Sequence, residues 1–169
     1  MKNGNRIGWL RFFLLAVCLF LSAPVTLQAA PKAAPGDLDP TFGIGGKVTI
    51  PSVPALALAI QPDGKLITVG CNLVRYNSDG SLDLTFGVGG IVNLDCSAIF
   101  LSVAIQADGK IVAGGATTTS GNNNFALARY NADGNLDATF GAGGKVTTAV
   151  GPYNSSIHAI AIQTDGKIV

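Results

Sequence analysis

The sequence contains no glutamate: all ten acidic residues among its 169 are aspartate. It also has a single histidine, a single methionine and a single tryptophan. Glutamate favours helices, whereas aspartate and glycine favour turns, and the chain has 22 glycines. The missing glutamate, together with frequent Val, Ile, Thr and Ala, therefore predicts strands joined by tight turns.

Motifs of enzymes and cofactor sites are absent as well. The chain has no G-x-S-x-G, C-x-x-C, H-E-x-x-H or G-x-x-x-x-G-K-[ST] sequence. The glycine-rich sequences at 43–46 and 141–144 precede predicted strands instead of helices, which excludes a dinucleotide-binding turn. The lone His158 aligns with Leu56 and Leu101 of the repeats described below, so we interpret it as structural. We predict no catalytic, cofactor-binding or metal-binding residues.

A long apolar run occurs only near the N-terminus, at residues 12–21. Three basic residues precede this run: Lys2, Arg6 and Arg11. Small residues follow it near Ala29, and this order is typical of a secretory signal peptide. A membrane span would need about 20 apolar residues. We predict a signal peptide over 1–29 with cleavage after Ala29, and a linker over 30–35; an uncleaved anchor is the alternative.

Neither charge nor cysteine indicates a particular partner. After removal of the signal peptide, eight basic and ten acidic residues remain, without a basic stripe for nucleic acid or an amphipathic helix for a membrane. We therefore expect no nucleic-acid partner and no membrane partner for a secreted, periplasmic or cell-surface protein. Cys71 and Cys96 would meet an oxidising compartment, where they pair or remain two partly buried thiols.

Residues 36–169 form a repeat. The sequence AIQ-x-DGK occurs at 59–65, 104–110 and 161–167. The sequence RYN-x-DG-x-LD occurs at 75–83 and 129–137, and TFG-x-GG at 41–46, 85–90 and 139–144. The AIQ-x-DGK sequences begin 45 and then 57 residues apart, and self-similarity at such a period indicates a repeat architecture.

Each unit is predicted to form four strands. The first strands, at 55–61, 100–106 and 157–163, alternate small and bulky apolar residues, and an Asp-Gly turn leads into the second strand. The third strand contains Arg-Tyr-Asn, and the fourth begins after TFG-x-GG, at 47–50, 91–94 and 145–148. Extra Thr, Ser and Asn residues near 116–124 are interpreted as a solvent loop.

Four antiparallel strands with two apolar faces predict an all-β protein made of β-propeller-like blades. A different stack of β-repeats is the alternative. A closed propeller has 4 to 8 blades, whereas this sequence holds about two and a half units. We therefore expect an incomplete propeller, as the front fragment of a longer chain with further repeats; self-assembly of copies is the second explanation.

The sequence LARYNADGNLDATFGAGGKV at 127–146, followed by AIQTDGKIV at 161–169, resembles the delta-60 repeat family of bacterial secreted proteins. The resemblance extends over residues 36–169. It implies a propeller-like β-repeat fold and an extracytoplasmic location. It implies no activity, so no catalytic residue is carried over.

One group of side chains suggests calcium. The alternating residues Asn131, Asp133, Asn135 and Asp137 offer oxygens, and calcium takes six to eight oxygen ligands. However, the glycine comes fourth instead of sixth, no glutamate closes the loop, and Ser81 replaces Asn135 in the earlier copy. Turn chemistry is the preferred interpretation.

Two charge pairs recur with the repeat. Arg75 with Asp83, and Arg129 with Asp137, are predicted to pair across the same turn in successive units. Because these pairs follow the repeat, we assign them a structural role.

The sequence therefore favours a non-enzymatic secreted scaffold whose loops recognise a protein or a cell surface. Two alternatives remain: a propeller enzyme of hydrolase or lyase type with its site in other blades, and a calcium-stabilised adhesin.

Overall fold

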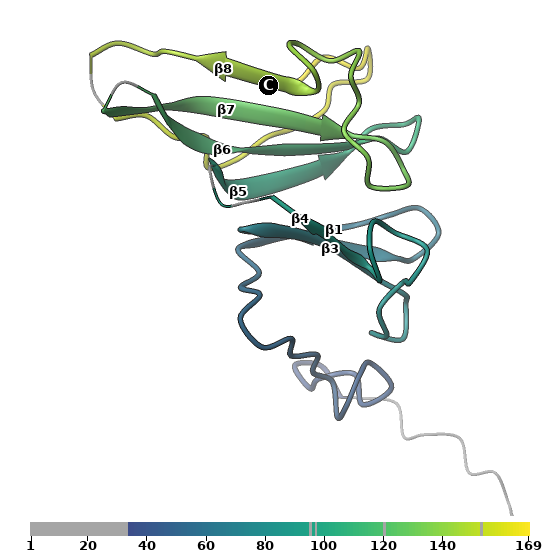
Figure 1. Ribbon diagram of the computed structural model, residues 1–169. Coiled ribbons are helices and arrows are strands. Elements are labelled where there is room, and N and C mark those ends of the chain that lie inside the picture. Colours follow the sequence, from purple (N-terminus) through teal and green to yellow (C-terminus); the bar gives the residue numbers. More distant parts are fainter. Residues whose placement is uncertain (1–33, 95, 97, 120, 153) are drawn as a thin grey trace, which may run out of the picture. The chain divides into compact units, whose positions relative to one another are not determined.

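The computed structural model describes residues 34–94, 96, 98–119, 121–152 and 154–169 (Figure 1). The described residues all belong to one compact unit, residues 32–169. The predicted signal peptide over 1–29 and most of the linker lie outside the described residues. In the described part, no helix is long and apolar enough to cross a membrane.

Eight strands form two four-stranded antiparallel sheets, which confirms the predicted fold class. The first sheet has the order β1-β2-β3-β4 and contains β1 (Ala57–Ile60), β2 (Leu66–Val69), β3 (Asn72–Tyr76) and β4 (Ile91–Asn93). The second has the order β5-β6-β7-β8 and contains β5 (Ala98–Ile105), β6 (Ile111–Thr119), β7 (Asn122–Tyr130) and β8 (Lys145–Thr148). Each sheet is one repeat unit, so the fold is that of open, β-propeller-like blades.

The Asp-Gly turns reverse the chain through backbone hydrogen bonds and a hydrogen bond to the aspartate carboxylate. At the first turn, Gln61 N donates to Lys65 O at 2.8 Å, and Gly64 N donates to Gln61 O at 2.9 Å. The Asp63 carboxylate accepts from Lys65 N at 3.1 Å, and Gly64 has a φ of 83°, which favours glycine. The turns at 106–110 and 163–167 have the same bonds.

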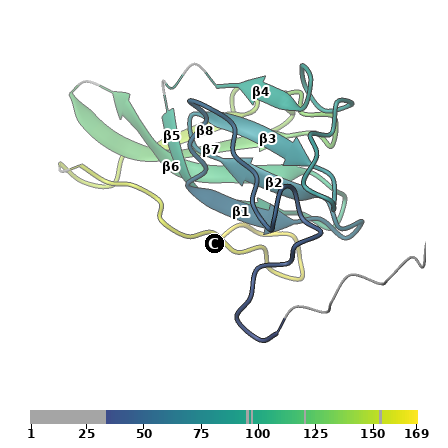
Figure 2. The same cartoon turned by 90° about the horizontal axis from the view of Figure 1, so that it is seen from below.

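The hydrophobic core lies between the two sheets. Strand β5 contacts both β1 and β2, and Figure 2 shows the first sheet in front of the second. The buried residues of this core are Ile67, Val69, Leu73, Phe86, Phe100, Ile111, Ala113, Ala128 and Tyr130. Burying one large apolar side chain contributes about 1.5–3 kcal/mol, so this shared core is a main source of stability.

Two predicted strands do not form. Residues 47–50 make only an isolated bridge, between Gly43 and Lys47. In the complete units the fourth strand pairs with the third strand of its own unit, and no described residue before 47 supplies a third strand. The predicted strand over 157–163 is likewise reduced to a bridge between Ile162 and Ile168.

The interpretation of residues 116–124 as a loop is wrong. Strands β6 and β7 continue through this segment, and their register includes Thr117 opposite Asn124 and Thr118 opposite Asn123. The hydroxyl of Thr118 also donates to Asn123 Oδ1 at 2.8 Å. Threonine favours strands, and the backbone hydrogen bonds between two strands form whatever the side chains are. Polar composition alone therefore did not distinguish an extended hairpin from a loop.

Successive units are joined by one recurring backbone hydrogen bond. The amide of Gly43, in the first TFG-x-GG sequence, donates to Asp79 O in the next unit at 2.7 Å. The amide of Gly87 donates to Asp133 O in the same way at 3.0 Å. The first two TFG-x-GG loops therefore bind the Asp-Gly turn of the following unit.

The glycine of that turn makes this close approach possible. At Gly134, with a φ of 93°, a Cβ atom would lie 2.9 Å from Val92 Cγ2 and 3.0 Å from Phe86 Cε2. These distances are shorter than normal van der Waals contact, and the same crowding recurs at Gly80. A side chain at either position would push the two units apart.

We predict that Gly134→Ala lowers the free energy of unfolding by about 2 kcal/mol more than Gly109→Ala does. Gly109 has a similar φ of 81°, but its nearest atom, Ala132 Cβ, would be 4.0 Å from an added Cβ. Both variants share the strain of a positive φ, which costs about 1 kcal/mol. The difference between their losses in the free energy of unfolding therefore measures the cost of disturbing the contact between units. Urea denaturation of both variants checks this, and equal losses would contradict it.

Candidate functional site

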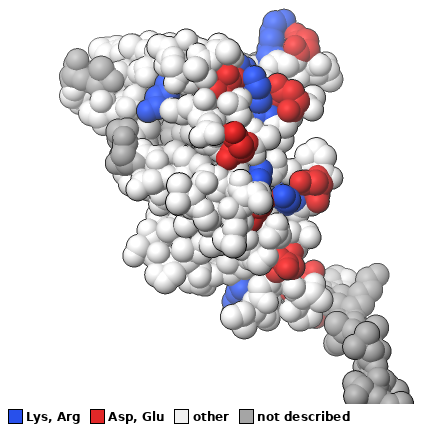
Figure 3. All heavy atoms as spheres, turned by 45° about the vertical axis from the view of Figure 1, so that its right-hand side comes forward, with Lys and Arg blue, Asp and Glu red and all other residues white. Residues whose placement is uncertain are grey.

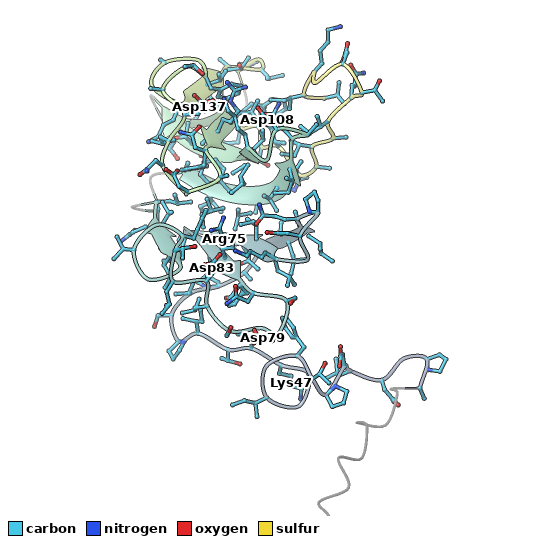
Figure 4. All side chains as sticks on the ribbon, turned by 90° about the vertical axis from the view of Figure 1, so that its right-hand side faces the viewer. Lys47, Arg75, Asp79, Asp83, Asp108 and Asp137 are labelled. Atoms are coloured by element: carbon cyan, nitrogen blue, oxygen red, sulfur yellow. The ribbon has the colours of Figure 1, made fainter. Side chains whose placement is uncertain are left out.

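A cluster of charged side chains lies at the turn end of the first sheet (Figure 4). The carboxylate of Asp83, whose side chain is 5% exposed, accepts from Arg75 Nε and from Lys65 Nζ, both at 2.7 Å. Its other oxygen accepts from the hydroxyl of Thr85 at 2.6 Å. The guanidinium of Arg75 lies 4.5 Å from the centroid of the Phe86 ring, a cation–π distance.

The second sheet has an equivalent cluster. Asp137 accepts from Arg129 Nε and Lys110 Nζ at 2.8 Å, and from Thr139 Oγ1 at 2.6 Å. Arg129 lies 4.5 Å from the Phe140 ring centroid. Both predicted Arg–Asp pairs are therefore confirmed.

Sequence reasoning missed the lysine, threonine and phenylalanine partners of these pairs. A signal for them was available, because each partner stands at a fixed place in the repeat. The lysine follows the first Asp-Gly, the threonine comes two residues after the aspartate, and the phenylalanine follows the threonine.

The first cluster also reaches the next unit. Arg75 Nη1 donates to Ala132 O at 2.5 Å, beside the turn that binds Gly87. The Arg75 side chain is 10% exposed, whereas that of its counterpart Arg129 is 19% exposed. The cluster is thus part of the contact between the two units, which we call the joint. Its charged side chains are bonded to one another.

The hydrogen bonds of the clusters favour ionised aspartates. The bond from Lys65, followed by that from Thr85, holds the pKa of Asp83 well below its usual range. The bond from Lys110, followed by that from Thr139, lowers the pKa of Asp137 in the same way. Neither carboxyl is poised as a proton donor near neutral pH.

In the possible calcium loop, the carboxylates of Asp133 and Asp137 accept hydrogen bonds from different partners. Asp133 accepts from the backbone and side-chain nitrogens of Asn135, both at 2.9 Å, and these bonds lower its pKa. Asn131 caps the same turn through its backbone, because Asn131 N donates to Asn135 O at 2.8 Å. Asp137 instead belongs to the charged cluster. Across the described residues, no three His, Cys, Asp or Glu side chains form a group that would hold a metal ion.

A cavity of 370 Å³ lies between the units, with walls from β4, β5, β7 and β8. Its lining mixes apolar and polar side chains, including Val92, Phe100, Asn135 and Lys145. A second, more open hollow of 610 Å³ lies beside it at Gly87 and Asn135. Both hollows lie at the contact between the units. Thr85 of the first cluster lines the second hollow, whereas the charged side chains of the two clusters line neither.

His158 is exposed, and its Nε2 lies 2.8 Å from the Ser156 hydroxyl. Neither residue lines the two cavities above. Cys71 and Cys96 are both thiols in the structure, and the Cys96 Sγ lies 4.0 Å from the Cys71 carbonyl oxygen.

Among the described residues, the opposite end of the sheets has no Asp, Lys or Arg; Asp95 also falls in this part of the sequence but lies outside the described residues. This end comprises the connections 50–56, 70–71, 94–98, 117–124 and 149–158. Figure 3 shows most of the acidic and basic side chains of this view along one side. Residues Thr118, Asn122, Asn123, Asn154 and Ser155 give this end a hydroxyl- and amide-rich character.

Two segments of the chain, residues 61–86 and 106–140, match the family described as "Domain of unknown function (DUF5122) beta-propeller". The segments are equivalent parts of the two units, since each begins at the first Asp-Gly turn and ends near the charged cluster. The match agrees with a β-propeller repeat fold and does not test the delta-60 name. Among curated proteins, no match was found.

We predict that Asp83→Asn lowers the free energy of unfolding at pH 7 by about 3 kcal/mol, because Lys65 and Arg75 lose their anionic partner. The pKa of Asp83 is lower in the folded than in the unfolded chain. Its stabilisation is therefore fully present above the unfolded pKa of about 4, and is lost as the pH falls through the folded pKa. Urea denaturation between neutral and acidic pH should give a shallower pH dependence for Asp83→Asn.

The matched control is Asp63→Asn, which changes an exposed turn carboxylate in the same way. This variant should keep both the stability and the acid dependence of the unchanged protein. Parallel pH profiles for the unchanged protein and Asp83→Asn would refute the assigned role of Asp83.

We predict that calcium at about 5 mM, above the range of weak extracellular sites, leaves the melting temperature unchanged. The carboxylates of Asp133 and Asp137 already accept internal hydrogen bonds, so calcium would have to displace these donors. Calorimetry with calcium and with a chelator checks this. A calcium-dependent rise that disappears in Asp133→Asn would contradict it.

Proposed function

We propose that this chain is a secreted, non-enzymatic scaffold that recognises a protein or a cell surface with the end of the sheets opposite the charged clusters. The proposal rests on one observation: charged side chains lie at the turn end of the sheets, and the other end has none among its described residues. At the turn end, the carboxylates form ion pairs with the cations or accept hydrogen bonds from the backbone of the turns. The other end is left to make contacts outside the chain.

The extended β6–β7 hairpin is the strongest candidate for the contact surface. It lengthens the second unit only at the end opposite the charged clusters, where β6 and β7 each have nine residues against four and five in the first unit. Its Asn123 backbone N donates to Asn154 Oδ1 at 2.8 Å, and Ser155 N donates to Asn123 O at 2.8 Å. These bonds tie the hairpin to the following unit and reduce the entropy that binding would cost.

The chemistry of this end suits recognition more than catalysis. Hydroxyl and amide groups such as those of Thr118, Asn122 and Asn154 donate and accept hydrogen bonds without the desolvation cost of a full charge. A catalytic role is disfavoured by the acidic residues themselves, since Asp83 and Asp137 follow the repeat and are held ionised by neighbouring cations. Secretion rests on the signal-peptide pattern of residues 1–29.

The test replaces residues 117–124 by the short Cys71–Asn72 connection of the first unit. The labelled mature protein should bind intact bacterial cells saturably, and the shortened variant should bind at least about tenfold more weakly, a loss of about 1.4 kcal/mol. The expected loss arises because the substitution removes the polar surface while both sheets keep their cores.

The control is Asp63→Asn, at the charged end, which should bind as the unchanged protein does. Circular dichroism of the shortened variant verifies that its sheets persist. Binding that is equal with and without the hairpin would overturn the assigned surface, and the absence of saturable binding would overturn the cell-surface partner.

A further inference from the structure

The cavity of 370 Å³ between the two units has buried side chains in its lining. Residues that pair directly across strands share one face of a sheet, and the register puts four residues in one row: Phe100, Gly115, Ala126 and Thr147. Phe100 and Ala126 line the cavity and are 4% and 5% exposed. From the first sheet, Val92 of β4 lines it and packs against the shared core. Because Gly115 and Ala126 are small, this row leaves room beside Phe100 that larger side chains would fill.

Lys145 is an exposed residue in the lining of the same cavity. It begins β8 and pairs with Ala128, which belongs to the core between the sheets. Lys145 therefore lies on the face of the second sheet that packs on the first. The first unit has Ile91 at the same place in the repeat, so the four-stranded fold does not require a cation there.

The charge of Lys145 is not balanced by a carboxylate among the described residues. The other cations of the two complete units each bind an aspartate at 2.7 or 2.8 Å, and these cations are Lys65, Arg75, Lys110 and Arg129. No described residue of the cavity lining is an aspartate. The cavity thus combines apolar walls with one ammonium group that remains available to an anion.

We propose that this cavity binds a small organic carboxylate, with its apolar body against Val92 and Phe100 and its carboxylate at Lys145. Sites for small molecules have volumes of about 300–1,000 Å³, largely apolar walls and a few polar groups that fix orientation. The cavity has these properties, and it lies within the chain, between two complete units. This binding goes beyond the proposed recognition of a protein or a cell surface.

The occupant is a monocarboxylate because of how charge and apolar surface are distributed. One ammonium group balances one negative charge, and a charge-assisted hydrogen bond to a carboxylate is stronger than a bond between neutral groups. Lys145 is exposed, so the carboxylate keeps part of its hydration and the cost of desolvation stays small. The apolar body leaves water for the space beside Phe100 and Val92, which is favourable.

The first experiment titrates the full mature chain with octanoate and, separately, with the neutral 1-octanol, and measures the heat of binding. Octanoate should bind saturably, with one molecule per chain, and more tightly than 1-octanol. Lys145→Gln should weaken octanoate binding about tenfold and leave 1-octanol binding unchanged, because only the contact with the carboxylate is lost. The matched control is Lys47→Gln, at the same place in the repeat but in the lining of neither cavity, which should bind like the unchanged protein.

A second variant tests the apolar part of the site. Thr147 lines the cavity and is exposed, so Thr147→Phe adds a ring there without replacing a core residue. Binding of both octanoate and 1-octanol should fall at least about tenfold. The matched control is Thr49→Phe, at the corresponding exposed place of the first TFG-x-GG segment and in the lining of neither cavity. Circular dichroism and urea denaturation verify that each variant is folded.

Three results would overturn the proposal. The first is the absence of saturable octanoate binding to the unchanged protein. The second is an equal effect of Lys145→Gln and Lys47→Gln, or 1-octanol binding as tightly as octanoate, since the carboxylate would then not be recognised at Lys145. The third is unchanged binding in folded Thr147→Phe, which would place the ligand outside this cavity.

Discussion

The joint between units is the contact on which the arrangement of the two sheets depends. The carbonyl of Asp133 accepts the Gly87 amide, and the neighbouring carbonyl of Ala132 accepts from Arg75. Arg75 is in turn held by Asp83, within the unit that precedes the turn. One set of bonds therefore orients the third strand of a unit, closes the loop before its fourth strand and binds the next unit. Because Arg75 and Asp83 are buried, losing either one leaves the other without its opposite charge, which is costly.

The charged residues at this joint already have bonding partners within the chain. Aspartates near arginines and lysines resemble an active site in a sequence, but here they are turn caps and partners of cations in every complete unit. Their pKa values are lowered by the hydrogen bonds they accept, which favours the permanently charged state. The proposed recognition surface therefore lies at the other end of the sheets. There the second unit extends its hairpin with Thr and Asn, which hydrogen-bond without the desolvation penalty of charge.

Much of the fold could be predicted, since the two-residue alternation, the Asp-Gly turns and the repeat period all indicate the same four-stranded unit. The Arg–Asp pairs were also predictable, because both partners recur at the same places. The predictions failed where pairing partners decide the outcome. Residues 47–50 have strand-forming composition but no third strand beside them, and residues 116–124 have loop-like composition but a complete ladder. A strand depends on a partner that local sequence does not contain.

By itself, the sequence determined the class of fold, the length of the repeat and the position of each turn, because these follow from local alternation and from the backbone freedom of glycine. Only the tertiary structure decided which face of each sheet is covered. Leu58 and Val103 occupy the same place in the repeat and are similarly apolar, yet one is half exposed and the other packs against the core. The difference arises because burial depends on the unit that lies alongside, which for Val103 is the first sheet.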